Sequence, residues 1–248
     1  AQADYLLAEL SLEFANQAVN EDDKKKHYTE AISRFSDIVA SYPDSPHAPK
    51  SQYKKALVCE KMGEIDMACE EYVKLSYRYP DNELVAETIA RLGQYFLAKG
   101  KKLLDEANAQ PDLVEREKIK MKAKEMNRTA AQVFGRLALR FPDHKLAGKT
   151  TVLSAQCYMR AEDMEKAIEV FKKVIDNKQA ESDLIAQSMY WCGDCYMKKN
   201  DFTNAYRLFK KLTWDYPEST WAKYARGRLT EEALARVEAT DTAAAGGN

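Results

Sequence analysis

Residues 190–217 read YWCGDCYMKKNDFTNAYRLFKKLTWDYP and alternate small and aromatic residues ahead of a proline. The members of this pattern are, in order, Gly193, Tyr196, Ala205, Phe209 and Pro217. Small side chains let two antiparallel helices approach closely, and the aromatic one turn later fills the space beside them. A proline cannot continue a helix, and the residue before it favours extended geometry. The stretch therefore predicts a helical hairpin that ends at Tyr216-Pro217.

The pattern recurs along the chain at a nearly constant interval. Alanines that lie four residues before an aromatic are spaced 37, 62, 37 and 38 residues apart. They are Ala31, Ala68, Ala130, Ala167 and Ala205, followed by Phe35, Tyr72, Phe134, Phe171 and Phe209. Aromatic-proline pairs at Tyr42-Pro43, Tyr79-Pro80, Phe141-Pro142 and Tyr216-Pro217 follow the same spacing. The long interval predicts an insertion of about 25 residues in the third unit.

The composition predicts an all-α protein and excludes some function classes. Turn formers are scarce, with 9 glycines and 7 prolines among 248 residues, so the elements between turns must be long. The 38 Lys and Arg residues are balanced by 39 Asp and Glu residues, which argues against a nucleic-acid binder. No apolar run approaches the roughly 18 residues of a membrane span. Because the chain begins at Ala1 rather than Met, we expect that an export signal or the rest of a longer chain preceded it.

The repeat predicts a single domain over residues 3–238, a right-handed α-solenoid of about five hairpins. The hairpins span residues 3–43, 46–80, 83–142, 145–180 and 182–217, a capping helix spans 219–238, and 239–248 form a disordered tail. Ser45, Asn82 and Ser219 follow three of the prolines and are expected to cap the next helix. The three tryptophans near the end, Trp191, Trp214 and Trp221, are expected to seal the fifth hairpin against the final helix.

The insertion lies between Lys99 and Thr129 and contains a single Pro-Asp pair at Pro111-Asp112. We predict one long hairpin, each helix extended by about 12 residues, which protrudes about 18 Å beyond its neighbours. Leu103, Leu104 and Ala107 would face Leu113, Ile119 and Met126. A disordered loop is the alternative, but the segment is rich in helix formers.

No motif indicates catalysis, a cofactor or a metal. Cys192 and Cys195 have CxxC spacing, but they lie inside a predicted helix rather than at its start, which favours a structural role. Gly148-Lys149-Thr150 resembles the end of a phosphate-binding loop but lacks the upstream glycine and strand. The three histidines are scattered, without metal-ligand spacing. We therefore predict that the protein is not an enzyme and carries no cofactor.

The order of small residue, aromatic, small residue, aromatic and proline resembles the tetratricopeptide repeat (TPR), whose period is 34 residues against 37–38 here. This resemblance implies a concave groove, lined by the first helix of each hairpin, that binds a protein or peptide partner. The inward positions would be Tyr53, Leu57, Gln94, Gln156, Met159, Arg160, Tyr190, Asp194 and Met197. Aromatic, Met and Arg side chains suit such a recognition surface.

The phrase Tyr42-Pro-Asp-Ser-Pro-His-Ala48 and its echo Tyr216-Pro-Glu-Ser-Thr-Trp-Ala222 resemble bacterial envelope TPR proteins, the BamD-like assembly lipoproteins and the YbgF-like Tol–Pal-associated family. That resemblance implies a periplasmic or outer-membrane-associated scaffold for protein assembly, with a lipid anchor upstream of Ala1. Five cysteines leave a cytoplasmic location open. A structural subunit of a larger assembly, or an interaction domain of a longer chain, are the alternative functions.

Overall fold

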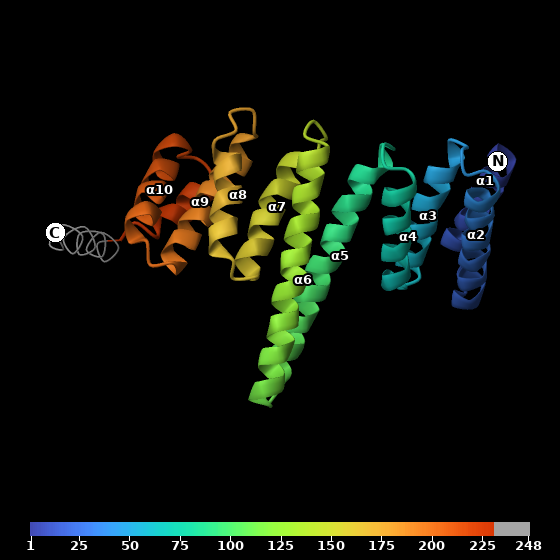
Figure 1. The fold of residues 1–248 in the computed structure, drawn as a ribbon, viewed down its shortest axis with the longest axis horizontal. Coiled ribbons are helices and arrows are strands. Elements are labelled where there is room, and N and C mark those ends of the chain that lie inside the picture. The colour runs from blue at the N-terminus through green and yellow to red at the C-terminus, as the bar shows by residue number, and fades with distance from the viewer. Residues whose placement is uncertain (231–248) are drawn as a thin grey trace. The chain divides into compact units, whose positions relative to one another are not determined.

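The computed structural model describes residues 1–230, which form eleven α-helices and no strand (Figure 1). The helices fall into two compact units, Ala1–Tyr95 and the part from Phe96 onward, and each is described by itself. The prediction of an all-helical fold is confirmed. That residues 3–238 act as a single domain stays a prediction.

The first unit consists of consecutive antiparallel helices. They are α1 (Gln2–Gln17), α2 (Glu21–Ser41), α3 (His47–Lys61), α4 (Ile65–Arg78) and the first part of α5 (Leu84–Ala109). Helix α2 packs against both α1 and α3, and α3 packs against α4. A core at the α1–α2 hairpin is built on Ala8, Ala31, Phe35 and Val58.

The second unit repeats the same arrangement. It contains the rest of α5, α6 (Leu113–Arg140), α7 (Ala147–Arg160), α8 (Met164–Ile175), α9 (Ser182–Lys198), α10 (Phe202–Asp215) and α11 (Thr220–Arg226). From α6 to α11 each helix packs against the next, and α9 also contacts α7 and α11. Hairpins that are consecutive in the sequence are thus also neighbours in the stack.

The repeat markers occupy equivalent buried places on the second helix of each hairpin. All five alanines and all five aromatics that follow them are at most 1% exposed. They lie on α2, α4, α6, α8 and α10. The predicted frame is therefore confirmed, insertion included.

Gly193 shows why the partner position in α9 must be small. A Cβ atom built there would lie 2.5 Å from Cε1 of the Phe209 ring, which is itself buried. The closeness of α9 and α10 thus depends on the absence of a side chain.

The predicted cap at Ser219 is confirmed, whereas the N-cap residue of α3 is Pro46 rather than the predicted Ser45. The Ser219 hydroxyl accepts a hydrogen bond from the Ala222 N–H at 3.0 Å. Ser45 and Asn82 accept from the N–H groups two residues later, at 3.2 and 3.0 Å. Within the described residues, the helix that begins at Thr220 ends at Arg226, and residues 227–230 are not helical. The rest of the predicted cap, and the tail over 239–248, lie outside the described residues.

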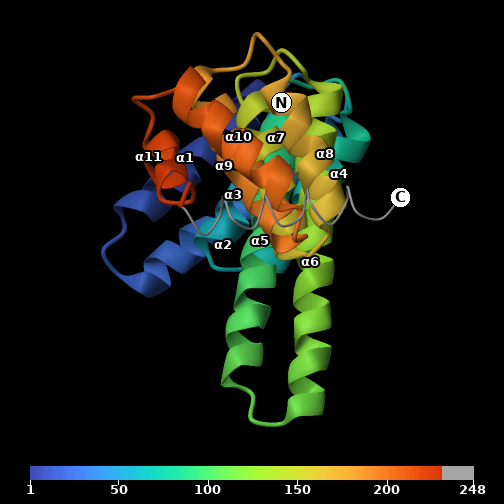
Figure 2. The same ribbon diagram turned by 90° about the vertical axis from the view of Figure 1, so that its left-hand side faces the viewer.

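The insertion in the third unit forms the predicted long hairpin. Helix α5 has 26 residues and α6 has 28, against 14 in α7. Figure 2 shows the second half of α5 beside the first half of α6, joined by a short turn. The Asp112 side chain caps α6 by accepting from the Glu115 N–H at 2.8 Å, and the Arg116 guanidinium donates to the Gln110 carbonyl at 2.7 and 2.9 Å.

One detail of the predicted hairpin is wrong. Ala107 and Ile119 are buried between the helices, but Leu104 and Leu113 are exposed, Leu113 by 69%. Residues six positions apart in a helix point about 120° apart, so Leu113 cannot share the inner stripe with Ile119. The inner stripe of α6 continues instead through Ala123, Asn127 and Ala130.

Candidate functional site

The predicted groove residues differ widely in how far they are exposed to solvent. Gln94 and Arg160 are exposed. Leu57, Gln156, Tyr190 and Met197 are half-buried, whereas Tyr53, Met159 and Asp194 are buried. Burial leaves the last three little surface for a partner, and the contacts below show what holds two of them.

Tyr53 cross-links α3 to the first part of α5. Its hydroxyl lies 3.2 Å from Glu87 Oε2 and accepts from Arg91 Nε at 3.1 Å. The same guanidinium pairs with Glu60 at 2.7 Å. Burial raises the pKa of Tyr53, and the positive charge of Arg91 opposes that change. These contacts give Tyr53 a structural role inside the first unit.

Tyr190 contacts α11, and Asp194 contacts the residues that follow it, so both hold this end of the unit against α9. The Asp194 carboxylate pairs with Arg228 at 3.3 Å and with Lys198 at 3.2 Å. The Tyr190 ring lies 5.6 Å from Trp221 and 5.8 Å from Phe209, measured between ring centroids. The expectation that Trp191 and Trp221 seal this end is confirmed, since their rings lie 6.0 Å apart. Trp214 is wrongly included in that seal, because it is 86% exposed on α10.

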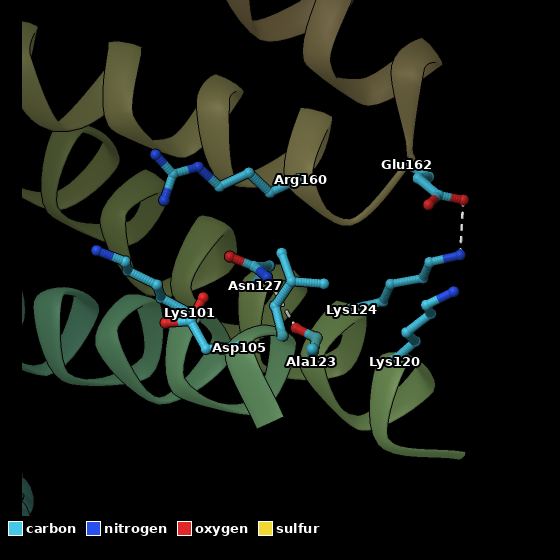
Figure 3. A pocket seen from close by; sticks show the side chains of 10 residues that line it. Lys101, Asp105, Lys120, Ala123, Lys124, Asn127, Arg160 and Glu162 are labelled. Atoms are coloured by element: carbon cyan, nitrogen blue, oxygen red, sulfur yellow. Dashed lines mark hydrogen bonds and ion pairs between the residues drawn. The ribbon is translucent and has the colours of Figure 1, made fainter. Parts of the chain in front are cut away.

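Arg160, the last residue of α7, is the predicted residue that lines a cavity. The cavity has a volume of about 500 Å³ and lies between the long hairpin and the turn that follows α7. Figure 3 shows its labelled side chains. We call it the hairpin pocket. It is lined by Gly100, Lys101, Leu104 and Asp105 of α5, Lys120, Ala123, Lys124 and Asn127 of α6, and Arg160 and Glu162.

The hairpin pocket carries more positive than negative charge. Its lining includes four cationic side chains and two carboxylates. Lys124 is paired with Glu162 at 2.6 Å, and Lys120 with Glu117 at 2.7 Å. Among the described residues, Lys101 and Arg160 form no ion pair. Two positive charges therefore remain available to a ligand.

Asn127 is the buried polar group of the pocket. Its Nδ2 donates to the Ala123 carbonyl at 2.8 Å, and its Oδ1 has no hydrogen-bond partner among the described residues. Gly100 makes room for this amide, because a Cβ at that position would lie 2.9 Å from Asn127 Nδ2. The pocket thus combines available positive charge with an unsatisfied acceptor.

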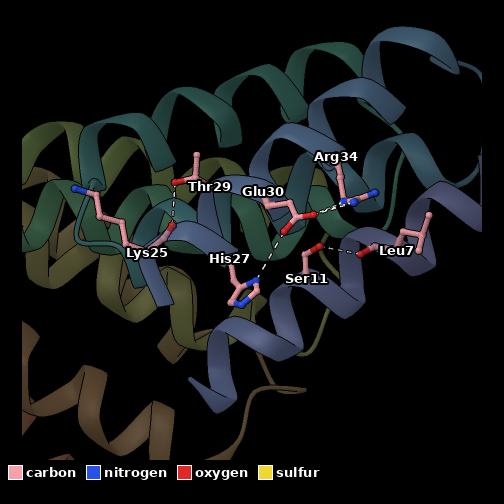
Figure 4. A network of polar contacts seen from close by, with 7 residues as sticks. All are labelled: Leu7, Ser11, Lys25, His27, Thr29, Glu30 and Arg34. Atoms are coloured by element: carbon pink, nitrogen blue, oxygen red, sulfur yellow. Dashed lines mark hydrogen bonds and ion pairs between the residues drawn. The ribbon is translucent and has the colours of Figure 1, made fainter. Parts of the chain in front are cut away.

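The described residues contain no arrangement that suggests catalysis. They contain no group of His, Cys, Asp and Glu that could hold a metal ion. Burial raises the pKa of Cys192 and Cys195 to about 12, so both stay protonated thiols at neutral pH. His27 and Arg34 both contact Glu30 along α2 (Figure 4), and the hydrogen bond from Arg34 holds the pKa of that carboxyl below its usual value. Such spacing within one helix is typical of surface charge pairing.

Sequence reasoning assigned Arg160 to the groove and did not predict the hairpin pocket. Lys120, Lys124 and Asn127 follow one another at helical spacing around Ala123, which places them on one stripe of α6. That stripe was a usable signal. The stripe lines a pocket only because Gly100 of α5 and Arg160 of α7 lie opposite it.

Comparisons with known proteins identify the class of fold. Residues 49–82 and 152–181 match one tetratricopeptide repeat family model, and residues 187–219 match another. These segments coincide with the second, fourth and fifth predicted hairpins, so these three hairpins match tetratricopeptide repeats. No curated protein matches the sequence.

Two of the solved structures similar to the chain are named for tetratricopeptide or TPR-like repeats. One holds nearly identical TPR-like repeats from a protein named as a kinesin light chain of Podosopora anserina, with 13% identity over 85% of this chain and 92% of that chain and a TM-score of 0.44. Another is a tetratricopeptide repeat protein from Parabacteroides merdae, with 14% identity, coverage of 96% and 98%, and a TM-score of 0.31.

Among residues 1–230, no helix combines the length and the apolar character needed to span a bilayer.

Proposed function

We propose that the protein is a non-enzymatic scaffold that binds a protein partner, and that the hairpin pocket is a principal contact. Tetratricopeptide repeats generally mediate protein–protein interaction, and three segments of this chain match them. The observation that carries the proposal is the pocket itself. It joins the end of one repeat helix, through Arg160, to the insertion that sets this chain's third unit apart.

A capture experiment with the intact chain tests this function. The double variant Lys101→Glu/Arg160→Glu is expected to lose its partner from an extract of the source organism, with unchanged helix content by circular dichroism. Lys122→Glu is the matched control, because Lys122 is exposed on α6 two residues from Lys120 and Lys124, and therefore on a different face. Partner capture that survives the double variant would contradict the proposed site.

A structural subunit is the second candidate, and one observation favours it. Leu6, Leu7, Leu10 and Phe14 are all at least 43% exposed along α1, so α1 presents an apolar face that the other described residues do not cover. Such a face suits end-to-end stacking of subunits. Light scattering over a concentration series separates the two functions: growth of the particle mass supports the subunit, and a constant monomer mass counts against it.

We also propose a bacterial envelope location, with a role in protein assembly. Its support is the resemblance of the two turn phrases, Tyr42–Ala48 and Tyr216–Ala222, to envelope TPR proteins. Cell fractionation of the native protein, with mass spectrometry for a lipid on the mature N-terminus, tests the compartment and the anchor together. A cytosolic, unmodified protein would refute both.

A further inference from the structure

We propose that the hairpin pocket binds an acidic segment of a peptide chain. In this arrangement the ligand carboxylates pair with Lys101 and Arg160, and a backbone N–H of the ligand donates to Asn127 Oδ1. The inference rests on the proposed function and names the chemistry of the partner.

The charge of the pocket selects a carboxylate. Lys120 and Lys124 already have carboxylate partners at 2.7 and 2.6 Å, so the ligand meets chiefly Lys101 and Arg160. Both are exposed and reach the pocket from different elements, α5 and the end of α7. Asp105 also lines the pocket and opposes a highly charged anion. A ligand with one or two carboxylates therefore matches the charge of the pocket better than a polyanion does.

The amide of Asn127 selects a ligand that can also donate a hydrogen bond. Its Nδ2 must face the Ala123 carbonyl, which can only accept, so Oδ1 is fixed as the unpartnered atom. Figure 3 shows this oxygen turned toward the side of the pocket on which Lys101 and Arg160 lie. Asn127 is only 5% exposed, and a buried acceptor without a donor costs free energy.

These two requirements together point to a peptide. A lone ionised carboxylate only accepts hydrogen bonds and cannot satisfy Asn127 Oδ1, whereas a peptide supplies carboxylates and N–H donors on one chain. The volume of about 500 Å³ lies within the range of ligand sites. Leu104 and Ala123 add apolar surface for the methylene groups of Glu side chains. Asn127 Oδ1 is buried, so a bond to the ligand requires the residues around it to shift.

Fluorescence anisotropy with labelled peptides of about ten residues tests the inference, since an extended chain of that length spans the pocket. A Glu-rich peptide is expected to bind the intact chain, and its Gln-for-Glu counterpart to bind at least about tenfold more weakly. Arg160→Glu and Lys101→Glu should each weaken the Glu-rich peptide about tenfold. Lys122→Glu should leave its affinity unchanged.

A second pair of measurements isolates the hydrogen bond to Asn127. Asn127→Leu removes the acceptor at similar volume and should weaken the normal peptide, but should affect little a version N-methylated along its backbone. A merely structural Asn127 would weaken both peptides equally. Should Asn127→Leu fail to fold, the N-methylated peptide against the intact chain still tests the bond, because it should bind more weakly than the normal peptide.

Several outcomes would overturn the inference. They are equal binding of the Glu and Gln peptides, equal weakening by Lys122→Glu and Arg160→Glu, and competition by succinate, inorganic phosphate or a single-stranded oligonucleotide as strong as by the peptide. If the double variant loses its native partner while no acidic peptide binds, the proposed function stands and this inference fails. If the acidic peptides bind but the double variant still captures the native partner, the peptide site stands and the pocket is not the contact for that partner.

Discussion

Gly193 is the residue at which the helix spacing can be tested most directly. We predict that Gly193→Ala destabilises the protein by about 1–3 kcal/mol, because the new methyl group overlaps the buried Phe209 ring at 2.5 Å. The gain in helix propensity, at most about 1 kcal/mol, offsets only part of that cost. Urea denaturation followed by circular dichroism measures the difference.

Gly135 supplies the matched control for this substitution. It also lies inside a helix, α6, but a Cβ there would meet its nearest atom, Ser154 Oγ, at an ordinary 3.5 Å. Gly135→Ala should therefore leave the free energy of unfolding unchanged or raise it by up to about 1 kcal/mol. Equal effects at the two glycines would show that contact with Phe209 does not decide the spacing.

Glu71 makes the stability of the first unit depend on pH. This buried carboxylate accepts from Lys74 at 2.7 Å, pairs with Lys55 at 3.3 Å and accepts from Gln52. Burial alone would raise its pKa, but the hydrogen bonds and charges of these partners hold the pKa below its ordinary value. A lowered pKa in the folded state means that the ionised group stabilises the fold above its unfolded pKa, and that this contribution is lost as the pH falls through the folded pKa.

The corresponding variant is Glu71→Gln. At neutral pH it should lower the free energy of unfolding by about 1–3 kcal/mol, because Lys55 and Lys74 lose a charged partner. In acid the difference between the variant and the natural protein should shrink as Glu71 becomes protonated. Denaturation curves at neutral and acidic pH measure both effects, and a constant difference at all pH values would contradict the assignment.

At the scale of the element, Gly100 sets how closely the two helices of the long hairpin approach. We predict that Gly100→Ala destabilises the hairpin by about 1 kcal/mol or more, since its Cβ would press on Asn127 Nδ2 at 2.9 Å and on the Ala123 carbonyl at 3.3 Å. The cost should be smaller in an Asn127→Ala background, where the crowded amide is gone. Hydrogen exchange of the α6 amides reads the effect locally, and full additivity of the two substitutions would exclude this contact.

The hairpins were predictable because their signal lies within each one. A small residue and an aromatic one turn apart both face the neighbouring helix, so their spacing predicts hairpin, frame and caps together. The facing of Leu113 was mispredicted, since apolar character alone does not reveal which stripe of a helix is covered. Tyr53 and Asp194 were assigned to a groove without regard to Arg91 and Arg228, which pair with them from distant parts of the chain.

The hairpin pocket could not be predicted for the same reason. Lys101, Asn127 and Arg160 are about 30 residues apart from one to the next, and each looks like an ordinary helix residue in the sequence. Only the packing of α6 against α7, together with the length of the inserted helices, places them around one cavity.

At the scale of the whole molecule, the cysteines report on how often the stacked helices open. Cys59, Cys157, Cys192 and Cys195 are buried, and Cys69 is half-buried. Burial raises the pKa of Cys157, as it does those of Cys192 and Cys195, to about 12. We predict that a thiol reagent at mildly alkaline pH modifies Cys69 first, and the other four only at the rate of local unfolding.

Peptide mass mapping of the modified protein over time measures this order. In full denaturant all five thiols should react together, which provides the control. Modification of Cys192 or Cys195 as early as that of Cys69 would mean that the core around α9 opens far more readily than its packing implies.

The long hairpin has a practical consequence. The inserted residues extend α5 and α6 on both sides of the turn at residues 110–112, yet Ala130 and Phe134 keep their buried places in the repeat. Length can therefore be added or removed at this tip in whole helical turns without changing the register of the units that follow. The tip is accordingly the site of choice for grafting an epitope, a spectroscopic label or a fused domain onto this protein.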